Sequence, residues 1–328
     1  MNNIIIISII DNNLVYLDLE NYKLQVCDFV LNNEKLIMKP ITNKVLLEEI
    51  EKYNSINSKG GSGNHSIPCN VYFYENKLYA MRIRLSHNSS GIHIGFFDNK
   101  TIYPINYTDQ KKCTMDLKCI CQSISSVESE YNYCKGFYIY NYHNVTRFRT
   151  ISDQILFLCQ GDEPKSSKKI IMRKDVNFKK TIIVNNKKYY AIMEDLENSK
   201  IIIIQVIMEN NELIIDEYSD YVIGNIHFEN YKNKYIDSTY CENLDAIIIL
   251  SKINTKHEDT YFYTIFDVSS NKIFTTEFKY GIPISIKLIN NDNILIQHIV
   301  DEKMHTKIIK LTLKPEIKYE HDILFYFN

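Results

Sequence analysis

Residues 18–24 read Asp18-Leu19-Glu20-Asn21-Tyr22-Lys23-Leu24, and two later stretches repeat this order of residue types. The second copy is residues 195–201 (DLENSKI) and the third is residues 267–273 (DVSSNKI). Each copy consists of aspartate, an aliphatic residue, three turn-like residues, lysine and a second aliphatic residue. Because Asp and Asn tolerate the positive φ angles of tight reversals, each copy predicts a turn that joins two antiparallel strands.

Strand-like segments flank all three copies and continue along most of the chain. They are short apolar runs with period-two character, separated by short polar turns. Hydrophobic residues make up 45% of the chain and charged residues 24%, with only 9 glycines and 6 prolines, which excludes collagen-like and low-complexity disordered classes. The chain has 25 tyrosines, which favour strands, and no tryptophan. The sequence therefore predicts an all-β protein.

The turn repeat resembles part of the WD40 family of β-propellers, namely the joint between the third and outer strands of a blade. Residues 9–18 look like a blade's second strand, its Asp-containing turn and its third strand. The Trp of the family's Trp-Asp pair is replaced by Leu17, Glu194 and Phe266 in the three copies. The resemblance implies a single β-propeller domain over residues 1–328, built from four-stranded antiparallel blades. At about 45 residues per blade, and allowing for insertions, the length predicts six or seven blades.

The spacing of the copies and the chain ends add two expectations. The first two copies start 177 residues apart, which fits about four units of roughly 45 residues, but the next interval of 72 residues fits no whole number. Insertions are therefore expected between blades. Because the chain begins within a blade and residues 323–327 (ILFYF) are strand-like, we expect the two termini to share one blade.

Two segments depart from the strand pattern and predict short helical insertions. Residues 43–54 have helical spacing of apolar residues and can be capped by Thr42 or Asn43. Residues 114–131 show the same spacing. Residues 57–65 include three of the nine glycines, which predicts a flexible loop.

The sequence contains no set of residues that predicts a catalytic site. Phosphate-binding loops, zinc-protease motifs, nucleophile elbows and dinucleotide fingerprints are missing, so we expect no cofactor and no enzyme activity. Isolated histidines in strand patterns, such as His298, are interpreted as wall or pocket residues. The weak candidates for zinc ligands lack paired CxxC spacing and are more simply ordinary thiols; they are Cys113, Cys119, Cys121 and Cys134.

A basic segment at residues 165–188 is the main candidate binding site, although the net charge of −2 gives the whole chain no attraction to nucleic acid. Clustered Lys and Arg neutralise phosphates, and the neighbouring Phe178, Tyr189 and Tyr190 can stack on unpaired bases. The segment is predicted to bind RNA or an acidic partner, and a solvated lysine-rich hairpin is the alternative. Its basic residues are Lys165, Lys168, Lys169, Arg173, Lys174, Lys179, Lys180, Lys187 and Lys188.

Three functional hypotheses follow. The N-terminus lacks the positive region of a signal peptide, and no apolar run reaches the roughly 18 residues that span a membrane, so we expect a cytoplasmic protein without a membrane partner. The first hypothesis is a non-catalytic interaction platform, bound to protein subunits of a larger assembly. The second is a factor that docks on a ribosome or other structured RNA through residues 165–188. The third is a propeller enzyme, which requires a central-channel site where several acidic or histidine side chains meet.

Overall fold

A computed structural model of the chain describes residues 4–32, 35–57, 64–86, 92–97, 102–108, 120, 131–134, 137–142, 145–150, 168–171, 176–184, 188–195, 197–209, 212–214, 222–226, 232–254 and 259–312. Within these residues the secondary structure consists of 24 β-strands and one α-helix. The predicted all-β class is therefore confirmed.

The strands form six antiparallel sheets, in which consecutive strands are usually neighbours. The first sheet contains β1 (Ile4–Ile10), β2 (Asn13–Asp18), β3 (Lys23–Asn32) and β4 (Lys35–Lys39), and the second contains β5 (Asn64–Tyr74), β6 (Lys77–Ser86), β7 (Ile92–Phe97) and β8 (Ile102–Thr108). The third contains β9 (Tyr131–Cys134), β10 (Phe137–Tyr142), β11 (Val145–Thr150) and β12 (Lys168–Ile171). The fourth contains β13 (Val176–Val184), β14 (Lys188–Asp195), β15 (Lys200–Glu209), β16 (Glu212–Ile214) and β17 (Val222–Ile226), where β16 and β17 both pair with β15. The fifth contains β18 (Lys232–Cys241), β19 (Ala246–Asn254), β20 (Asp259–Asp267) and β21 (Lys272–Glu277), and the sixth contains β22 (Ile282–Asn290), β23 (Asn293–Val300) and β24 (Lys303–Lys310).

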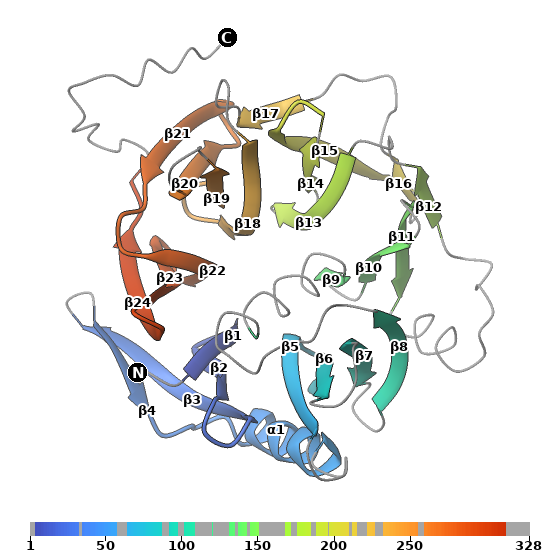
Figure 1. Cartoon of the computed structure of the whole chain (residues 1–328), viewed down its shortest axis with the longest axis vertical. Helices are drawn as coiled ribbons and strands as arrows, with labels where there is room; N and C mark the ends of the chain where they lie inside the picture. The colour runs from blue at the N-terminus through green and yellow to red at the C-terminus, as the bar shows by residue number, and fades with distance from the viewer. Residues whose placement is uncertain are drawn as a thin grey trace.

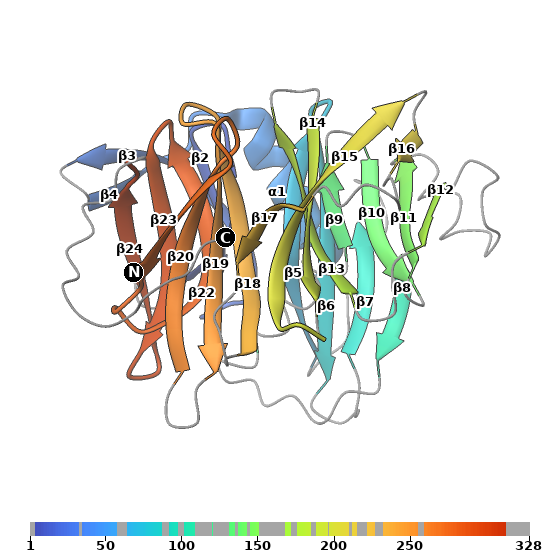
Figure 2. The same cartoon turned by 90° about the horizontal axis from the view of Figure 1, so that it is seen from above.

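The six sheets lie around a common centre, with the first strand of each sheet innermost (Figure 1). These inner strands contact one another in the order β1, β5, β9, β13, β18 and β22, and β22 in turn contacts β1. Figure 2 shows the sheets from the side, standing next to one another. The fifth sheet packs against the fourth on one face and against the sixth on the other, which explains why Ala246–Leu250 is fully buried at five consecutive positions.

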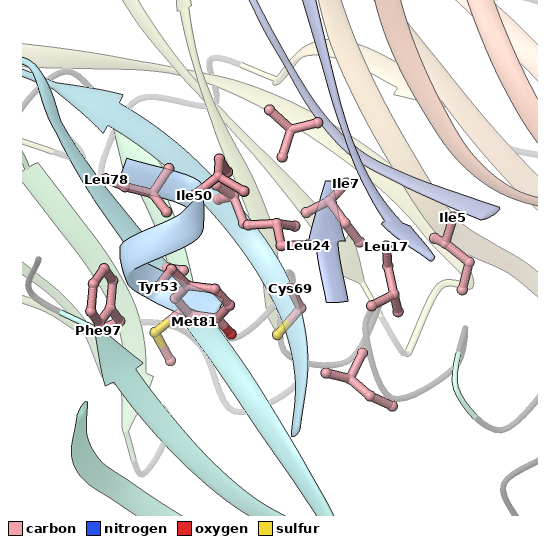
Figure 3. Close-up of a cluster of buried hydrophobic side chains, with 14 of the residues drawn as sticks. Ile5, Ile7, Leu17, Leu24, Ile50, Tyr53, Cys69, Leu78, Met81 and Phe97 are labelled. Carbon is pink, nitrogen blue, oxygen red and sulfur yellow. The ribbon is translucent and has the colours of Figure 1, made fainter. Parts of the chain in front are cut away.

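Hydrophobic clusters fill the spaces between the sheets. Alternate residues of β1 face opposite ways: Ile5 and Ile7 join Met81 of the second sheet in one cluster (Figure 3), whereas Ile6 joins Leu295 of the sixth sheet in another. The period-two pattern of β1 therefore supplies two interfaces, because both of its faces are buried.

The single helix, α1 (Lys44–Asn57), packs against β3 and β6 between the first and second sheets (Figure 1). It begins after Asn43, whose Oδ1 accepts a hydrogen bond from Leu46 N at 3.1 Å, as an N-cap residue does. Leu46, Ile50 and Tyr53 are buried, and the Tyr53 ring meets the Phe97 ring edge-on, with the ring centroids 5.1 Å apart. The predicted insertion at residues 43–54 is confirmed, and the helix extends it to residue 57.

Other expectations fall wholly or partly outside the described residues. Of the second predicted insertion, residues 114–131, only Ile120 and the first residue of β9 are described, and Ile120 is buried beside the first and second sheets. Most of the predicted loop at residues 57–65 and all of residues 323–327 also lie outside. β1 belongs to a sheet made of β1 to β4, so among the described residues no C-terminal strand joins the N-terminal one in a shared sheet.

The three Asp-to-Lys stretches adopt the same turn. In each, the aspartate and the lysine are paired residues of adjacent strands. The residue before the lysine has a positive φ, which is 54° at Tyr22, 54° at Ser199 and 56° at Asn271. The aspartate carboxylate holds the turn, as where Asp195 accepts bonds from the backbone N and the side-chain Nδ2 of Asn198 at 2.9 and 2.8 Å. The predicted strand reversals are confirmed at all three places.

The position of this turn within the sheets corrects the expected repeat. The first two copies join the second and third strands of their sheets (β2–β3 and β14–β15), and only the third copy joins a third strand to a fourth (β20–β21). The 177 residues between the first two copies cover three sheets, or 177/3 = 59 residues per sheet, rather than four units. The interval of 72 residues fits no whole number because the third copy lies at a different joint.

Candidate functional site

Backbone bulges recur in the inner strands. In five of the six, one extra residue interrupts the pairing with the second strand of the sheet. The extra residues are Ile7, Asn70, Lys179, Ile236 and Ile284, and the residues that follow them are Ser8, Val71, Lys180, Asp237 and Ser285. Because bulges redirect side chains and leave backbone groups unpaired, these positions need partners from outside the strand.

Near three of these bulges, polar side chains of neighbouring sheets bind a backbone N–H of the inner strand. The acceptors Glu194 (β14), Asp237 (β18) and Gln297 (β23) bind Tyr235 N, Ile286 N and Ile6 N at 2.5, 2.9 and 2.7 Å, respectively. Each bond runs from one sheet to the inner strand of the next sheet along the ring of contacts. We call these three bonds the inter-sheet ties.

Two of the tie residues also belong to a cluster of charged side chains from the fourth, fifth and sixth sheets. Asp237 Oδ1 lies 2.8 Å from Lys180 Nζ, and Asp237 Oδ2 lies 3.7 Å from Lys287 Nζ. Beside them, Lys179 Nζ lies 2.9 Å from Glu194 Oε2. We call these five residues the inner-strand cluster. Among the described residues, its three ammonium groups outnumber its two carboxylates, so it can attract a small anion.

Asp237 is the buried centre of the cluster, because only 5% of its side chain is exposed. Burial raises the pKa of this carboxyl group. The charges of Lys180 and Lys287 and the bonds from Lys180 and Ile286 N lower it by more, so the net pKa is below its ordinary value. The carboxylate therefore stays ionised at neutral pH and holds both lysines in place. Lys180 Nζ also donates to Ser238 O at 2.5 Å.

The predicted basic segment is divided between this cluster and the third sheet. Lys179 and Lys180 are described with their side chains, and both are ion-paired within the cluster. Lys168 and Lys169 lie on β12, the edge strand of the third sheet, and Lys188 begins β14, whereas Lys165, Arg173, Lys174 and Lys187 lie outside the described residues. RNA binding by this segment stays a prediction.

The sequence analysis missed Asp237, Lys287 and Gln297. Asp237 lies 57 residues from Lys180 along the chain, and Gln297 lies 291 residues from Ile6, so no local pattern connects the partners. A weak signal existed at Gln297 and His298, which are two consecutive polar residues inside the apolar run Ile294–Val300.

The structure tests the predicted cysteine ligands only in part. Cys134 lies on β9, and the other three candidates lie outside the described residues, so the zinc site stays a prediction. Within the described ranges, no group of three or more His, Cys, Asp or Glu could hold a metal ion. The thiols of Cys27, Cys69 and Cys241 are buried, and burial raises the pKa of Cys27 to about 11. No helix in the described part of the chain is long and apolar enough to cross a membrane.

A pocket of about 370 Å³ lies between α1 and β3, away from the inner strands. Its lining mixes apolar residues such as Leu47 and Ile50 with polar ones such as Lys23, Gln25 and Glu51. The hydroxyl of Ser55 in its lining donates to Lys52 O at 2.8 Å, within the helix, so we take the inner-strand cluster as the better candidate for chemistry.

Comparisons with known proteins show similarity of fold only. No family model and no curated protein matches the sequence. One similar solved structure comes from a structural and mechanistic study of two prolyl endopeptidases; it is 8% identical, has a TM-score of 0.38, and the match covers 94% of this chain and 40% of that one. Another is prolyl oligopeptidase B from Galerina marginata, bound to a hydrolysis and macrocyclization substrate; it is 8% identical, has a TM-score of 0.40, and the match covers 94% and 43%.

These matches correct one expectation. The chain spans about two fifths of the length of each of these proteins, and its antiparallel four-stranded sheets are compatible with a β-propeller but do not single out the WD40 family. Both proteins are peptidases, so the similar structures contradict the expected non-catalytic platform. At TM-scores below 0.5 the likeness assigns no activity, substrate or residue role to this chain.

Proposed function

We propose that residues 1–328 form a single closed β-propeller with six blades, one for each sheet. The support is the cycle of contacts from β1 through β5, β9, β13, β18 and β22 back to β1. Closure of such a ring leaves only short, protected sheet edges. We propose a WD40-type blade only for the fifth sheet, because there the turn from Asp267 to Lys272 joins the third and fourth strands.

We further propose that this propeller is the body of an enzyme whose site is the inner-strand cluster. The observation that carries the proposal is a group of five charged side chains from three sheets, four of which lie on inner strands. Lys180 has three N–H donors, and its bonds to Asp237 and Ser238 O leave one for a ligand. Lys180 and Lys287 bind the carboxylate or phosphate of a small substrate, and Asp237 acts as a positioning residue for both.

A substrate screen with matched variants tests this proposal. Purified wild type is assayed for turnover of a panel of small phosphate and carboxylate esters, and hits are repeated with Lys180→Met and with Lys252→Met as the control. Lys252 is also ion-paired, 2.6 Å from Asp259, but lies outside the cluster. We expect kcat/KM to fall at least about tenfold in Lys180→Met, the loss typical of one charged contact, and to be unchanged in the control. A panel without turnover, or equal effects of both substitutions, contradicts the proposal.

RNA binding through residues 165–188 is a second candidate function. It would take place in the cytoplasm, where the sequence predicts the protein to be. The observation that favours it is the register of the third sheet, where Lys169 on β12 is paired with Arg147 on β11. Two basic residues thus occupy neighbouring positions next to a sheet edge, where phosphates could be neutralised. Filter binding of a structured RNA against salt is the test, with Lys168→Glu/Lys169→Glu compared with Lys303→Glu/Lys310→Glu. Affinity should fall only in the first variant, and its salt dependence should become weaker by about two charges.

A further inference from the structure

The sixth sheet carries another group of polar and aromatic side chains, separate from the inner-strand cluster. His298 on β23 and His305 on β24 are paired residues, and their rings stack with centroids 5.8 Å apart. The Phe278 ring meets His298 edge-on at 5.4 Å. Two residues after His305, Lys307 places its Nζ 4.6 Å from the centroid of the Tyr280 ring. Five side chains from three consecutive segments therefore gather at one end of this sheet.

His298 is a buried histidine with one unpartnered ring nitrogen. Only 6% of the residue is exposed, and its Nδ1 is buried without a partner in the described part of the structure. Burial lowers the pKa of His298, a backbone hydrogen bond with Ile296 raises it, and the charges of His305 and Lys307 lower it, so the net pKa is below its ordinary value and the imidazole is neutral at pH 7. Because nearly all buried polar atoms in folded proteins have a partner, the unpartnered Nδ1 indicates a ligand.

The charges of this group are also uncompensated. Within the described ranges, none of His298, His305 and Lys307 forms a salt bridge, whereas the nearby Lys279 is paired with Glu277 at 3.2 Å. The ammonium of Lys307, without a paired carboxylate among the described residues, favours an anion over a metal ion, since it would repel a cation.

Gly281 brings the segment before β22 against the end of β23. Its φ is +129°, and a Cβ at this position would lie 2.6 Å from Ile299 O. On either side of it, Tyr280 and Ile282 are 51% and 43% exposed. An accessible aromatic ring therefore lies next to the basic group.

We propose that His298, His305 and Lys307 bind a phosphate group, and that Tyr280 stacks on a planar ring attached to it. Nδ1 of His298, the exposed imidazole of His305 and the ammonium of Lys307 donate charge-assisted or neutral hydrogen bonds to the phosphate oxygens. The exposed part of the tyrosine ring provides a surface for stacking. This site is distinct from the proposed enzyme site and does not depend on it.

Calorimetric titrations with AMP, ribose 5-phosphate and inorganic phosphate test both parts of the proposal. Wild type should bind all three, with AMP the tightest. Lys307→Met and His305→Gln should each weaken all three ligands by about tenfold or more, as loss of a charge-assisted bond does. Tyr280→Ala should weaken AMP alone. Lys310→Met, on the same strand and 3.7 Å from Asp292, is the control and should change nothing.

Three results would overturn the proposal. If the wild-type protein binds none of the three probes, the phosphate site does not exist. Equal affinity in Lys307→Met and Lys310→Met means that the contact is non-specific attraction. Equal weakening of AMP and ribose 5-phosphate by Tyr280→Ala removes the stacking part. His305 is exposed and Lys307 half-buried, so both variants keep the core residues, and circular dichroism verifies their folding.

Discussion

Replacing Gln297 by leucine tests whether the side chains between the sixth and first sheets close the ring. Gln297 is fully buried. Its Oε1 accepts a bond from Ile6 N at 2.7 Å, and its Nε2 donates to Ile4 O at 3.4 Å. Leucine has a similar volume, so the substitution removes these two bonds, and the long 3.5 Å bond from Ser285 Oγ to Oε1, with little change in packing.

The expected cost follows from these two contacts. Leaving the buried Ile6 N–H unpaired costs about 1–3 kcal/mol, and losing the longer bond to Ile4 O adds about 0.5–1 kcal/mol. The loss is therefore about 2–4 kcal/mol from a total stability of roughly 5–15 kcal/mol. At about 2.1 cal/mol/K per residue, 328 residues have an unfolding entropy of about 0.7 kcal/mol/K, so Tm should fall by about 3–6 °C.

Hydrogen exchange locates the effect, and Gln25→Leu on β3 provides the control. Gln25 is half-buried and belongs to neither the ring of inner strands nor its ties. In Gln297→Leu, amides of β1 should exchange faster while those of β19 keep their protection, because the sixth-to-first interface opens first. A Tm change below about 1 °C together with unchanged exchange in β1 would refute the role of Gln297 in closing the ring.

Three further substitutions test other parts of the structure. Asp237→Asn should cost about 3–5 kcal/mol at pH 7, because it leaves two lysines beside a buried, uncharged partner. The pKa of Asp237 in the folded state lies below its ordinary 3.8, so the stability that the carboxylate contributes is present above pH 3.8 and is lost as the pH falls through the folded value. In urea unfolding, the difference in stability between wild type and Asp237→Asn should therefore shrink below pH 3.8, and a constant difference would contradict this. Gly281→Ala puts a Cβ 2.6 Å from Ile299 O at a φ of +129°, so the urea midpoint should fall by the equivalent of roughly 1–3 kcal/mol, and an unchanged midpoint would show that this backbone is not constrained. Asn43→Ala removes the acceptor of Leu46 N and should cost about 1 kcal/mol in thermal melts, whereas Asn43→Asp should retain wild-type stability.

Short-range features of the fold could be predicted from the sequence. The three Asp-to-Lys turns depend on a carboxylate that binds its own turn and on one residue with positive φ, and both are properties of about six consecutive residues. The start of α1 depends on Asn43 and the apolar spacing that follows it. Strand pairs joined by short turns, such as β2–β3 and β20–β21, follow from the same local chemistry.

The same locality explains the error about the repeat. An Asp-to-Lys turn satisfies its own hydrogen bonds wherever two antiparallel strands meet, so it does not distinguish the second-to-third joint from the third-to-fourth. Counting units from the turns therefore gave four where the structure has three sheets.

By itself, the sequence determined the all-β class, the strand reversals and the position of α1, because each depends on residues that are neighbours along the chain. Only the tertiary structure decided which sheets are adjacent and which polar side chains meet between them. Lys180 reaches Asp237 across 57 residues, and Gln297 reaches Ile6 across 291. These contacts form only when sheets stack and their buried polar groups must find partners, and a requirement of packing leaves no periodic pattern in the sequence.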